Sequence, residues 1–219
     1  MKKRPEVDES LRWHRELLLE KTAQALRNNG FAAAVFANRQ NVRPFLIDAA
    51  RDATIVGFGG SITLAQIGFA KELERAGKTL LSHGRPGLSP KERFALMRRQ
   101  LSCDIFFTST NALTINGQLV NIDGTGNRVG AMAFGPPKVV VVAGVNKIVR
   151  DLDSALRRVK EVVVPPNARR MGYAPPCTQT GICVDCNSPE RVCRITAIIE
   201  RKPRDTEITV CLVNEHLGY

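Results

Sequence analysis

The sequence has few aromatic residues, few histidines and no long apolar run. Its aromatic residues are nine Phe, two Tyr and one Trp, and no run alternates basic with aromatic side chains as single-strand nucleic-acid platforms do. We therefore do not expect a nucleic acid as partner. No stretch reaches the roughly 20 consecutive apolar residues of a membrane helix, and no apolar segment follows the basic start at residues 1–4. The sequence thus predicts a cytoplasmic protein without a membrane span.

The three histidines, His14, His83 and His216, lie far apart in the sequence. Serine and cysteine nucleophiles usually depend on a nearby histidine base, so this spread gives no support for a catalytic triad. His83 stands at the end of a predicted strand and is the one histidine that we keep as a functional candidate.

The remaining composition is that of a globular protein with a strong positive charge. Hydrophobic residues make up 43% and charged residues 24%, and the formal net charge of +11 favours an anionic partner. A chain of 219 residues buries about 70% of its unfolded surface without disulfides. In a reducing cytoplasm its six cysteines are therefore candidates for metal ligands, redox groups or core residues rather than for a disulfide framework.

Apolar patterns predict an α/β fold, in which a mostly parallel sheet carries helices on both faces and a β-hairpin forms an excursion. Strands are expected at residues 31–37, 53–57, 78–82, 103–108, 138–144, 162–164, 194–201 and 206–213. Helices are expected at residues 10–28, 39–50, 63–76 and 90–102, and after Asn146, which we expect to cap the last of them. The turn dipeptides Asn116-Gly117 and Asp123-Gly124 place the hairpin after Ser109.

A glycine-rich turn follows the predicted strand at 53–57. Glycines in Gly57-Phe-Gly-Gly-Ser61-Ile-Thr63 allow backbone amides to approach an anion, and the hydroxyl groups can add to the site. We predict that this turn binds an anion through Gly57, Gly59, Gly60, Ser61 and Thr63. The dinucleotide fingerprint is incomplete because Ile62 takes the place of its third glycine, so a tight turn without a ligand remains the alternative.

A second polar loop runs from Asn121 to Arg128. Asp123 is a candidate general base, or it orders Arg128, whose guanidinium group would clamp a carboxylate. The further ligand-binding candidates are Asn111, Asn121, Gly124, Thr125, Gly126 and Asn127. The alternative is that this segment is a simple hairpin connection.

Four cysteines gather near the end of the chain, in the spacing Cys177-x5-Cys183-x2-Cys186-x6-Cys193. Four thiolates so close in sequence match the ligand set of zinc or of an iron–sulfur cluster. The alternatives are a redox disulfide, reactive thiols or simple packing. Cys103 and Cys211 fall in predicted strands and are expected in the core.

With these motifs in this order, the chain resembles the lactate-utilisation domain proteins, formerly a domain of unknown function. The resemblance rests on the segments Gly57–Thr63, Ser109–Thr114, Asp123–Arg128 and Lys138–Gly144, and it spans nearly the whole chain. It implies one α/β domain over residues 1–219, with an N-terminal helix at 10–28 and a Cys-rich loop at 175–193. It also implies a fold related to ribose-5-phosphate isomerase, glucosamine-6-phosphate deaminase and coenzyme A transferases.

The resemblance implies a role in lactate (2-hydroxy acid) utilisation, alongside iron–sulfur partner proteins of an oxidation complex. Our hypothesis is an accessory or catalytic subunit that binds a small anion, a carboxylate or a phosphate. One alternative is a stand-alone enzyme for a phosphorylated sugar or an acyl-CoA, with Asp123 as its base, although no Glu lies between Cys103 and Gly144 to serve coenzyme A transfer. A second alternative is a metal- or redox-responsive interaction protein. The sequence leaves enzymatic turnover open.

Overall fold

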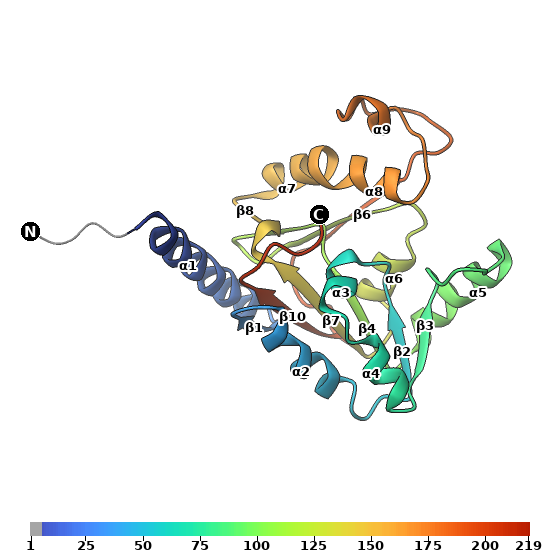
Figure 1. Ribbon diagram of the computed structural model, residues 1–219, viewed down its shortest axis with the longest axis horizontal. Coiled ribbons are helices and arrows are strands. Elements are labelled where there is room, and N and C mark those ends of the chain that lie inside the picture. The colour runs from blue at the N-terminus through green and yellow to red at the C-terminus, as the bar shows by residue number, and fades with distance from the viewer. Residues whose placement is uncertain (1–5) are drawn as a thin grey trace, which may run out of the picture.

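The computed structural model describes residues 6–219, and the start of the chain, on which we based the absence of an apolar leader, lies outside this range. At its centre is a six-stranded parallel sheet with the order β1-β10-β7-β4-β2-β3 (Figure 1). The strands are β1 (Ala32–Phe36), β2 (Ile55–Phe58), β3 (Thr79–Ser82), β4 (Ile105–Ser109), β7 (Lys138–Gly144) and β10 (Glu207–Val213). The predicted α/β architecture with a mostly parallel sheet is thus confirmed.

Strand β7 illustrates how both sides of this sheet are buried. After Lys138 its sequence is a continuous apolar run, as expected for a central parallel strand. Val139 and Val141 pack in one core, whereas Val140 and Val142 pack in another on the opposite face. Each face of the sheet therefore requires its own covering layer.

Helices form part of the covering layer on each face (Figure 1). One core joins the sheet to α2, α3 and α4, and the other joins it to α1, α5 and α6. These helices are α1 (Val7–Asn28), α2 (Arg39–Ala49), α3 (Ile62–Ile67), α4 (Ala70–Arg75), α5 (Pro90–Arg99) and α6 (Asn127–Ala133), with short 3-10 turns η1 (Gln100–Ser102) and η2 (Val145–Lys147). Within residues 6–219 no helix has the length and hydropathy of a membrane span.

A second sheet has four strands in the order β8-β5-β6-β9 and shares a core with the first. Its strands are β5 (Ala112–Thr114), β6 (Leu119–Asp123), β8 (Ile148–Val149) and β9 (Ile195–Ile199). Strands β5 and β6 are antiparallel neighbours, which confirms the predicted hairpin. A continuous helical segment packs on this sheet and consists of α7 (Leu152–Arg158), η3 (Val159–Val163) and α8 (Val164–Arg170). The loop after α8 contains the short helix α9 (Cys177–Thr180).

Two predicted elements need correction. The helix predicted over 63–76 is divided into α3 and α4, because Gly68 adopts a left-handed conformation (φ +73°) and ends α3. The strand predicted at 162–164 is wrong, since these residues belong to η3 and α8. The π-helical turn η3 ends two residues before Pro165, and Pro165 and Pro166 cannot donate the hydrogen bonds of a helix interior.

Two connections also differ from the prediction. Asn146 does not cap a helix, because its Oδ1 accepts a hydrogen bond from Leu217 N (3.0 Å), and Asp151 caps α7 instead. Asp123-Gly124 does not form a hairpin turn, because the chain continues through Gly126 (φ +86°) into α6. The polar loop therefore connects a strand of the second sheet to a helix.

The Gly57→Ala variant should be destabilised by about 1–3 kcal/mol, because an added Cβ would lie 2.8 Å from both Cys103 Sγ and Phe106 Cδ2. The control is Gly84→Ala, where an added Cβ meets no heavy atom within 4 Å. Its free energy of unfolding should change by less than about 0.5 kcal/mol. Urea denaturation measures both values, and equal midpoints for the two variants would contradict the close packing of β2 against β4.

Candidate functional site

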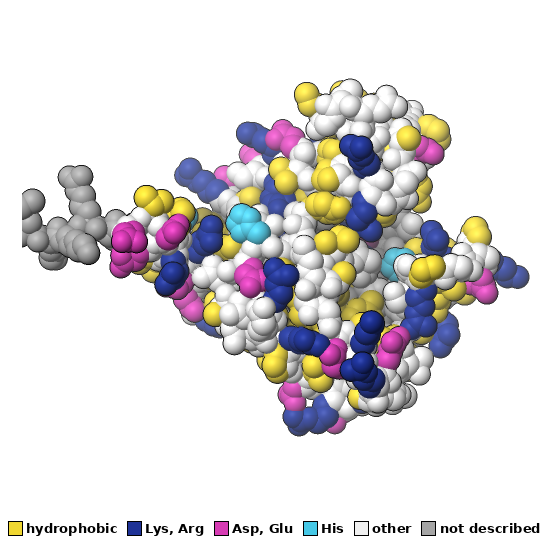
Figure 2. Space-filling view, viewed as in Figure 1, with side chains coloured by type: hydrophobic (Ala, Val, Ile, Leu, Met, Phe, Trp, Pro, Cys, Tyr) yellow, Lys and Arg dark blue, Asp and Glu magenta, His cyan; other side chains and the backbone are white. Residues whose placement is uncertain are grey.

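A cavity of about 880 Å³ opens at the carboxyl edge of the six-stranded sheet. The ends of four strands contribute to it: Ser61 follows β2, His83 follows β3, Ser109 ends β4 and Lys147 follows β7. From β2 the chain passes to β3 on one side, and β4 lies on the other side of β2. Open α/β sheets commonly bind ligands in such a crevice, where the strand order reverses. Figure 2 shows the surface hollowed between α5 and the region of α7–α9.

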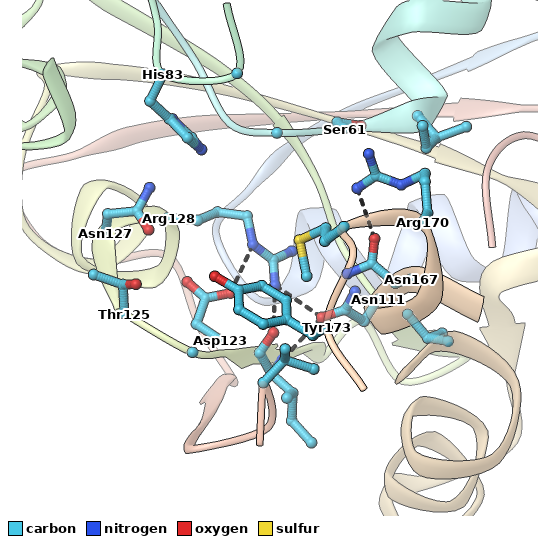
Figure 3. A pocket seen from close by; sticks show the side chains of 18 of the residues that line it. Ser61, His83, Asn111, Asp123, Thr125, Asn127, Arg128, Asn167, Arg170 and Tyr173 are labelled. Atoms are coloured by element: carbon cyan, nitrogen blue, oxygen red, sulfur yellow. Dashed lines mark hydrogen bonds and ion pairs between the residues drawn. The ribbon is translucent and has the colours of Figure 1, made fainter. Parts of the chain in front are cut away.

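The remaining walls come from the second sheet, from α5, α6 and α8, from the loop that follows α8, and from Gly218 and Tyr219. In Figure 3, Ser61 and His83 lie on one side of the cavity, and Asp123 and Tyr173 lie on the other. Arg128 lies between these groups. The cavity thus combines residues from both sheets.

The glycine-rich turn contributes Gly60, Ser61 and Thr63 to the cavity, whereas Gly57 and Gly59 do not line it. An added Cβ on Gly59 would meet Thr108 Oγ1 at 2.8 Å, so this glycine, like Gly57, permits close packing against β4. The Ser61 side chain caps α3. Anion binding by the turn therefore stays a prediction.

The second polar loop contributes most of its predicted residues to the same cavity. Those that line it are Asp123, Gly124, Thr125, Asn127 and Arg128, and Asn111, a predicted candidate outside the loop, lines it as well. Asn121 is fully buried, and Gly126 precedes α6. The two motifs singled out in the sequence are thus brought together, and the ligand-binding role of each residue stays a prediction.

Arg128 is held by a dense set of hydrogen bonds. Its Nε and Nη2 donate to Asp123 Oδ1 at 2.9 and 2.6 Å, and its Nη1 donates to Asn121 Oδ1 at 2.7 Å and Ser109 O at 3.0 Å. Nη2 also donates to Asn111 Oδ1 at 2.8 Å and to a main-chain carbonyl at 3.0 Å. Every nitrogen of this guanidinium therefore has acceptors within the protein, and a ligand would have to displace one of them.

Asp123 is engaged to a similar degree. Its Oδ1 accepts from Arg128, its Oδ2 accepts from Val129 N at 3.0 Å, and its side chain is 8% exposed. These contacts agree with the interpretation that Asp123 orders Arg128. A role as general base stays a prediction.

Lys147 is a cavity residue that the sequence analysis missed. It is 4% exposed, and its Nζ donates to Ser109 Oγ at 2.9 Å and to Thr110 O at 3.0 Å. Among residues 6–219 it takes part in no ion pair. Burial, and to a smaller extent the charges of Arg158 and Arg128, lower the pKa of Lys147 to about 7. Its place just after a predicted central strand was the available signal, because that strand ends at the same sheet edge as the glycine-rich turn.

His83 lines the cavity, and its imidazole contacts the side chain of a buried glutamine. Gln100 is fully buried and donates from Nε2 to Phe58 O and Leu81 O, both at 2.8 Å, and its Oε1 lies 3.3 Å from His83 Nδ1. Burial lowers the pKa of His83 below its ordinary value. The imidazole is therefore mainly neutral at pH 7 and offers hydrogen bonds rather than charge.

Positive charge prevails around the cavity. Its basic side chains are Arg93, Arg128, Lys147, Arg170, Arg191 and Arg194, and its acidic ones are Asp123 and Glu190. Asp123 is neutralised by Arg128, and a Glu190 carboxylate oxygen accepts from Ala174 N at 2.8 Å. The cavity is therefore suited to anions.

The four clustered cysteines line a second, small pocket. Burial raises the pKa of the Cys177 thiol, and the neighbouring Cys183, Cys186 and Cys193 raise it further. None of the four forms a disulfide. Within the described residues no three His, Cys, Asp or Glu side chains are arranged as ready ligands of a metal ion, so the predicted zinc or iron–sulfur cofactor stays a prediction.

Replacing Arg128 by Met should lower the free energy of unfolding by about 3–5 kcal/mol, because it leaves the Asp123 carboxylate buried without its counter-charge. The control is Arg93→Met, at an exposed cavity residue that makes no ion pair within residues 6–219, and a change below about 0.5 kcal/mol is expected there. Chemical denaturation measures both. A loss below about 1 kcal/mol for Arg128→Met would mean that the pair is not structural.

Comparison with solved structures supports the fold. The crystal structure of a DUF162 family protein from Deinococcus radiodurans superposes with a TM-score of 0.52 at 14% identity, covering 91% of this chain and 98% of the other. The eIF2B beta structure from Chaetomium thermophilum gives a TM-score of 0.31 at 17% identity, covering 64% and 44%, which is too low to support an argument. None of the curated proteins compared with the chain matches it.

Comparison with protein families gives a match that covers most of the chain. The LUD domain matches residues 19–213, and DUF162 is the same family. The matched range includes the six-stranded sheet, the glycine-rich turn and the polar loop. The chain therefore belongs to the LUD domain family, which implies a role in lactate utilisation.

Proposed function

We propose that the cavity binds a small 2-hydroxy or 2-oxo acid, such as lactate or pyruvate. The chain would then serve lactate utilisation as an accessory or catalytic subunit of an oxidation system. The observation that carries this proposal is Lys147, a buried amine that faces the cavity and has no carboxylate partner among residues 6–219.

An ammonium group buried without a counter-charge is unfavourable, and the lowered pKa of Lys147 reflects this cost. A bound carboxylate would supply the missing negative charge. Ser109 Oγ accepts from Lys147 and lies 3.4 Å from Thr63 Oγ1. These two hydroxyl groups are suited to the 2-hydroxyl or 2-oxo oxygen of such an acid.

Arg170 is a second candidate anchor. Among the described residues its guanidinium donates to Asn167 Oδ1 alone, at 2.8 Å, so its other N–H groups are available to a ligand. Arg128 differs in this respect, because each of its nitrogens already has an acceptor. We therefore assign the charge that receives the ligand to Lys147 and Arg170 rather than to Arg128.

The volume of the cavity favours a second candidate. A three-carbon acid leaves most of the 880 Å³ unfilled, and this volume falls within the range of drug-sized ligands. A larger anion, a phosphorylated sugar or an acyl-CoA, would use more of this space and the same cations. The chain would then be a stand-alone enzyme.

Calorimetric titration at pH 6.5 with lactate, pyruvate, ribose 5-phosphate and coenzyme A discriminates between these candidates. We expect lactate or pyruvate to bind, and we expect Lys147→Met to weaken binding by more than about tenfold, equivalent to 1.4 kcal/mol. The matched control is Lys138→Met, which removes an exposed lysine at the opposite end of the same strand and should leave affinity unchanged. Binding of the sugar phosphate or coenzyme A alone would favour the stand-alone enzyme, and equal affinity in both variants would refute the role of Lys147.

The lowered pKa of Lys147 also predicts a pH dependence of stability. Between about pH 7 and pH 10.5 the unfolded chain keeps the proton that the folded chain has lost, so stability should rise with pH in this window. The upper limit of this rise is about 1.4 kcal/mol per pH unit. We expect the unfolding free energy of the wild type minus that of Lys147→Met to increase from pH 7 to pH 9, because only the wild type contains the titrating amine. A difference that stays constant over this interval would show that Lys147 titrates normally.

A further inference from the structure

The loop between α8 and β9 gathers four cysteines around one small pocket. Its lining includes Cys177, Cys183, Cys186 and Cys193, together with Asp185 and Arg191, and its volume of about 10 Å³ is that of one water-sized body. All four cysteines are free thiols. We infer that they bind a soft metal through four thiolates. One zinc ion matches the volume of the pocket, and an iron–sulfur cluster would require the loop to widen around it.

The donor set fits such a metal. Thiolates are preferred ligands of both zinc and iron–sulfur clusters, and both use four of them. Within residues 6–219 no three candidate ligands form a finished metal site, although all four cysteines line the same pocket. Binding would draw the sulfur atoms together around the metal, with each thiol releasing its proton to solvent.

Core packing accounts for only some of the cysteines. Cys103 and Cys211 are 1% and 0% exposed and belong to the main cores, as predicted. Cys183, Cys186 and Cys193 are instead partly exposed. Cys177 belongs to the core between the second sheet and the helical segment above it, and Cys193 packs against that core, so a role in the core leaves Cys183 and Cys186 unexplained.

The loop has little apolar burial of its own. Ile182 and Val184, on either side of Cys183, are 67% and 59% exposed, and α9 has only four residues. A segment that buries so little apolar surface gains little from the hydrophobic effect to offset its loss of conformational entropy. Metal ligation supplies an ordering free energy that the loop lacks.

Arg191 fixes the backbone from which the thiols extend. Its Nε donates to Cys193 O at 2.8 Å, and its Nη1 donates to Cys186 O at 2.5 Å. Its Nη2 donates to Asp185 Oδ1 at 2.8 Å, and Asp185, between Cys183 and Cys186, has a left-handed backbone conformation (φ +45°). Two cysteine carbonyls and the Asp185 carboxylate are thereby held by one side chain.

The direct test is metal analysis of the full chain purified anaerobically, with zinc, iron and acid-labile sulfide measured per chain. We expect about one zinc, or iron with an equal amount of sulfide, and these two results distinguish the two forms of the centre. Cys186→Ser should lower the metal content at least tenfold, whereas the control Cys211→Ala should retain it. Wild type with neither metal, or equal metal content in the two variants, would overturn the inference.

A second measurement remains informative if Cys186→Ser folds poorly. The reduced, metal-free wild-type chain is titrated with Co²⁺, and thiolate-to-cobalt charge-transfer absorption is followed as zinc is then added. We expect one equivalent of Co²⁺ to bind with thiolate absorption and to be displaced by zinc. Absence of this absorption, or a disulfide among the four cysteines in anaerobic protein, would refute a shared thiolate site.

Discussion

The guanidinium group of Arg128 joins the two sheets, and the cavity depends on this junction. It donates to Ser109 O at the end of β4 in the first sheet, and to the side chains of Asn121 and Asp123 in β6 of the second. A guanidinium is planar and has five N–H donors in fixed directions, so it sets the relative orientation of every group that accepts from it. The walls of the cavity are therefore positioned by an ion pair that is almost entirely removed from water.

Much of the fold could be predicted because local and tertiary preferences agree along the main sheet. The valine run of β7 specifies a buried strand from its composition alone, and Gly30 and Gly77 stand at the ends of α1 and α4. Prediction failed where tertiary contacts override local preference. The valines at 162–164 favour a strand by propensity, but they follow α7 as part of a helical segment that packs on the second sheet.

The candidate site could be predicted in its parts, whereas its balance of charge could not. The glycine-rich turn and the polar loop are recognisable from residue types, and parallel strands place both at one sheet edge. Arg128 also donates to Ser109 O, 19 residues away, and Lys147 has no carboxylate partner among residues 6–219. Both properties depend on the tertiary structure around these residues. Gly59 shows the same limit, because a glycine that accommodates Thr108 cannot be distinguished in the sequence from one that approaches a ligand.

Arg128 and Lys147 converge on the same residue: Arg128 binds the carbonyl of Ser109, and Lys147 binds its hydroxyl group. Lys147 is also attached to the end of β7, a strand paired on both sides, which limits its movement toward solvent. Near neutral pH its amine is close to half protonated. A carboxylate bound beside this amine, as proposed above, would favour its protonated form, so binding near pH 7 would take up at most about half a proton for each anion. Anion binding beside Lys147 and proton uptake would then form a single coupled equilibrium.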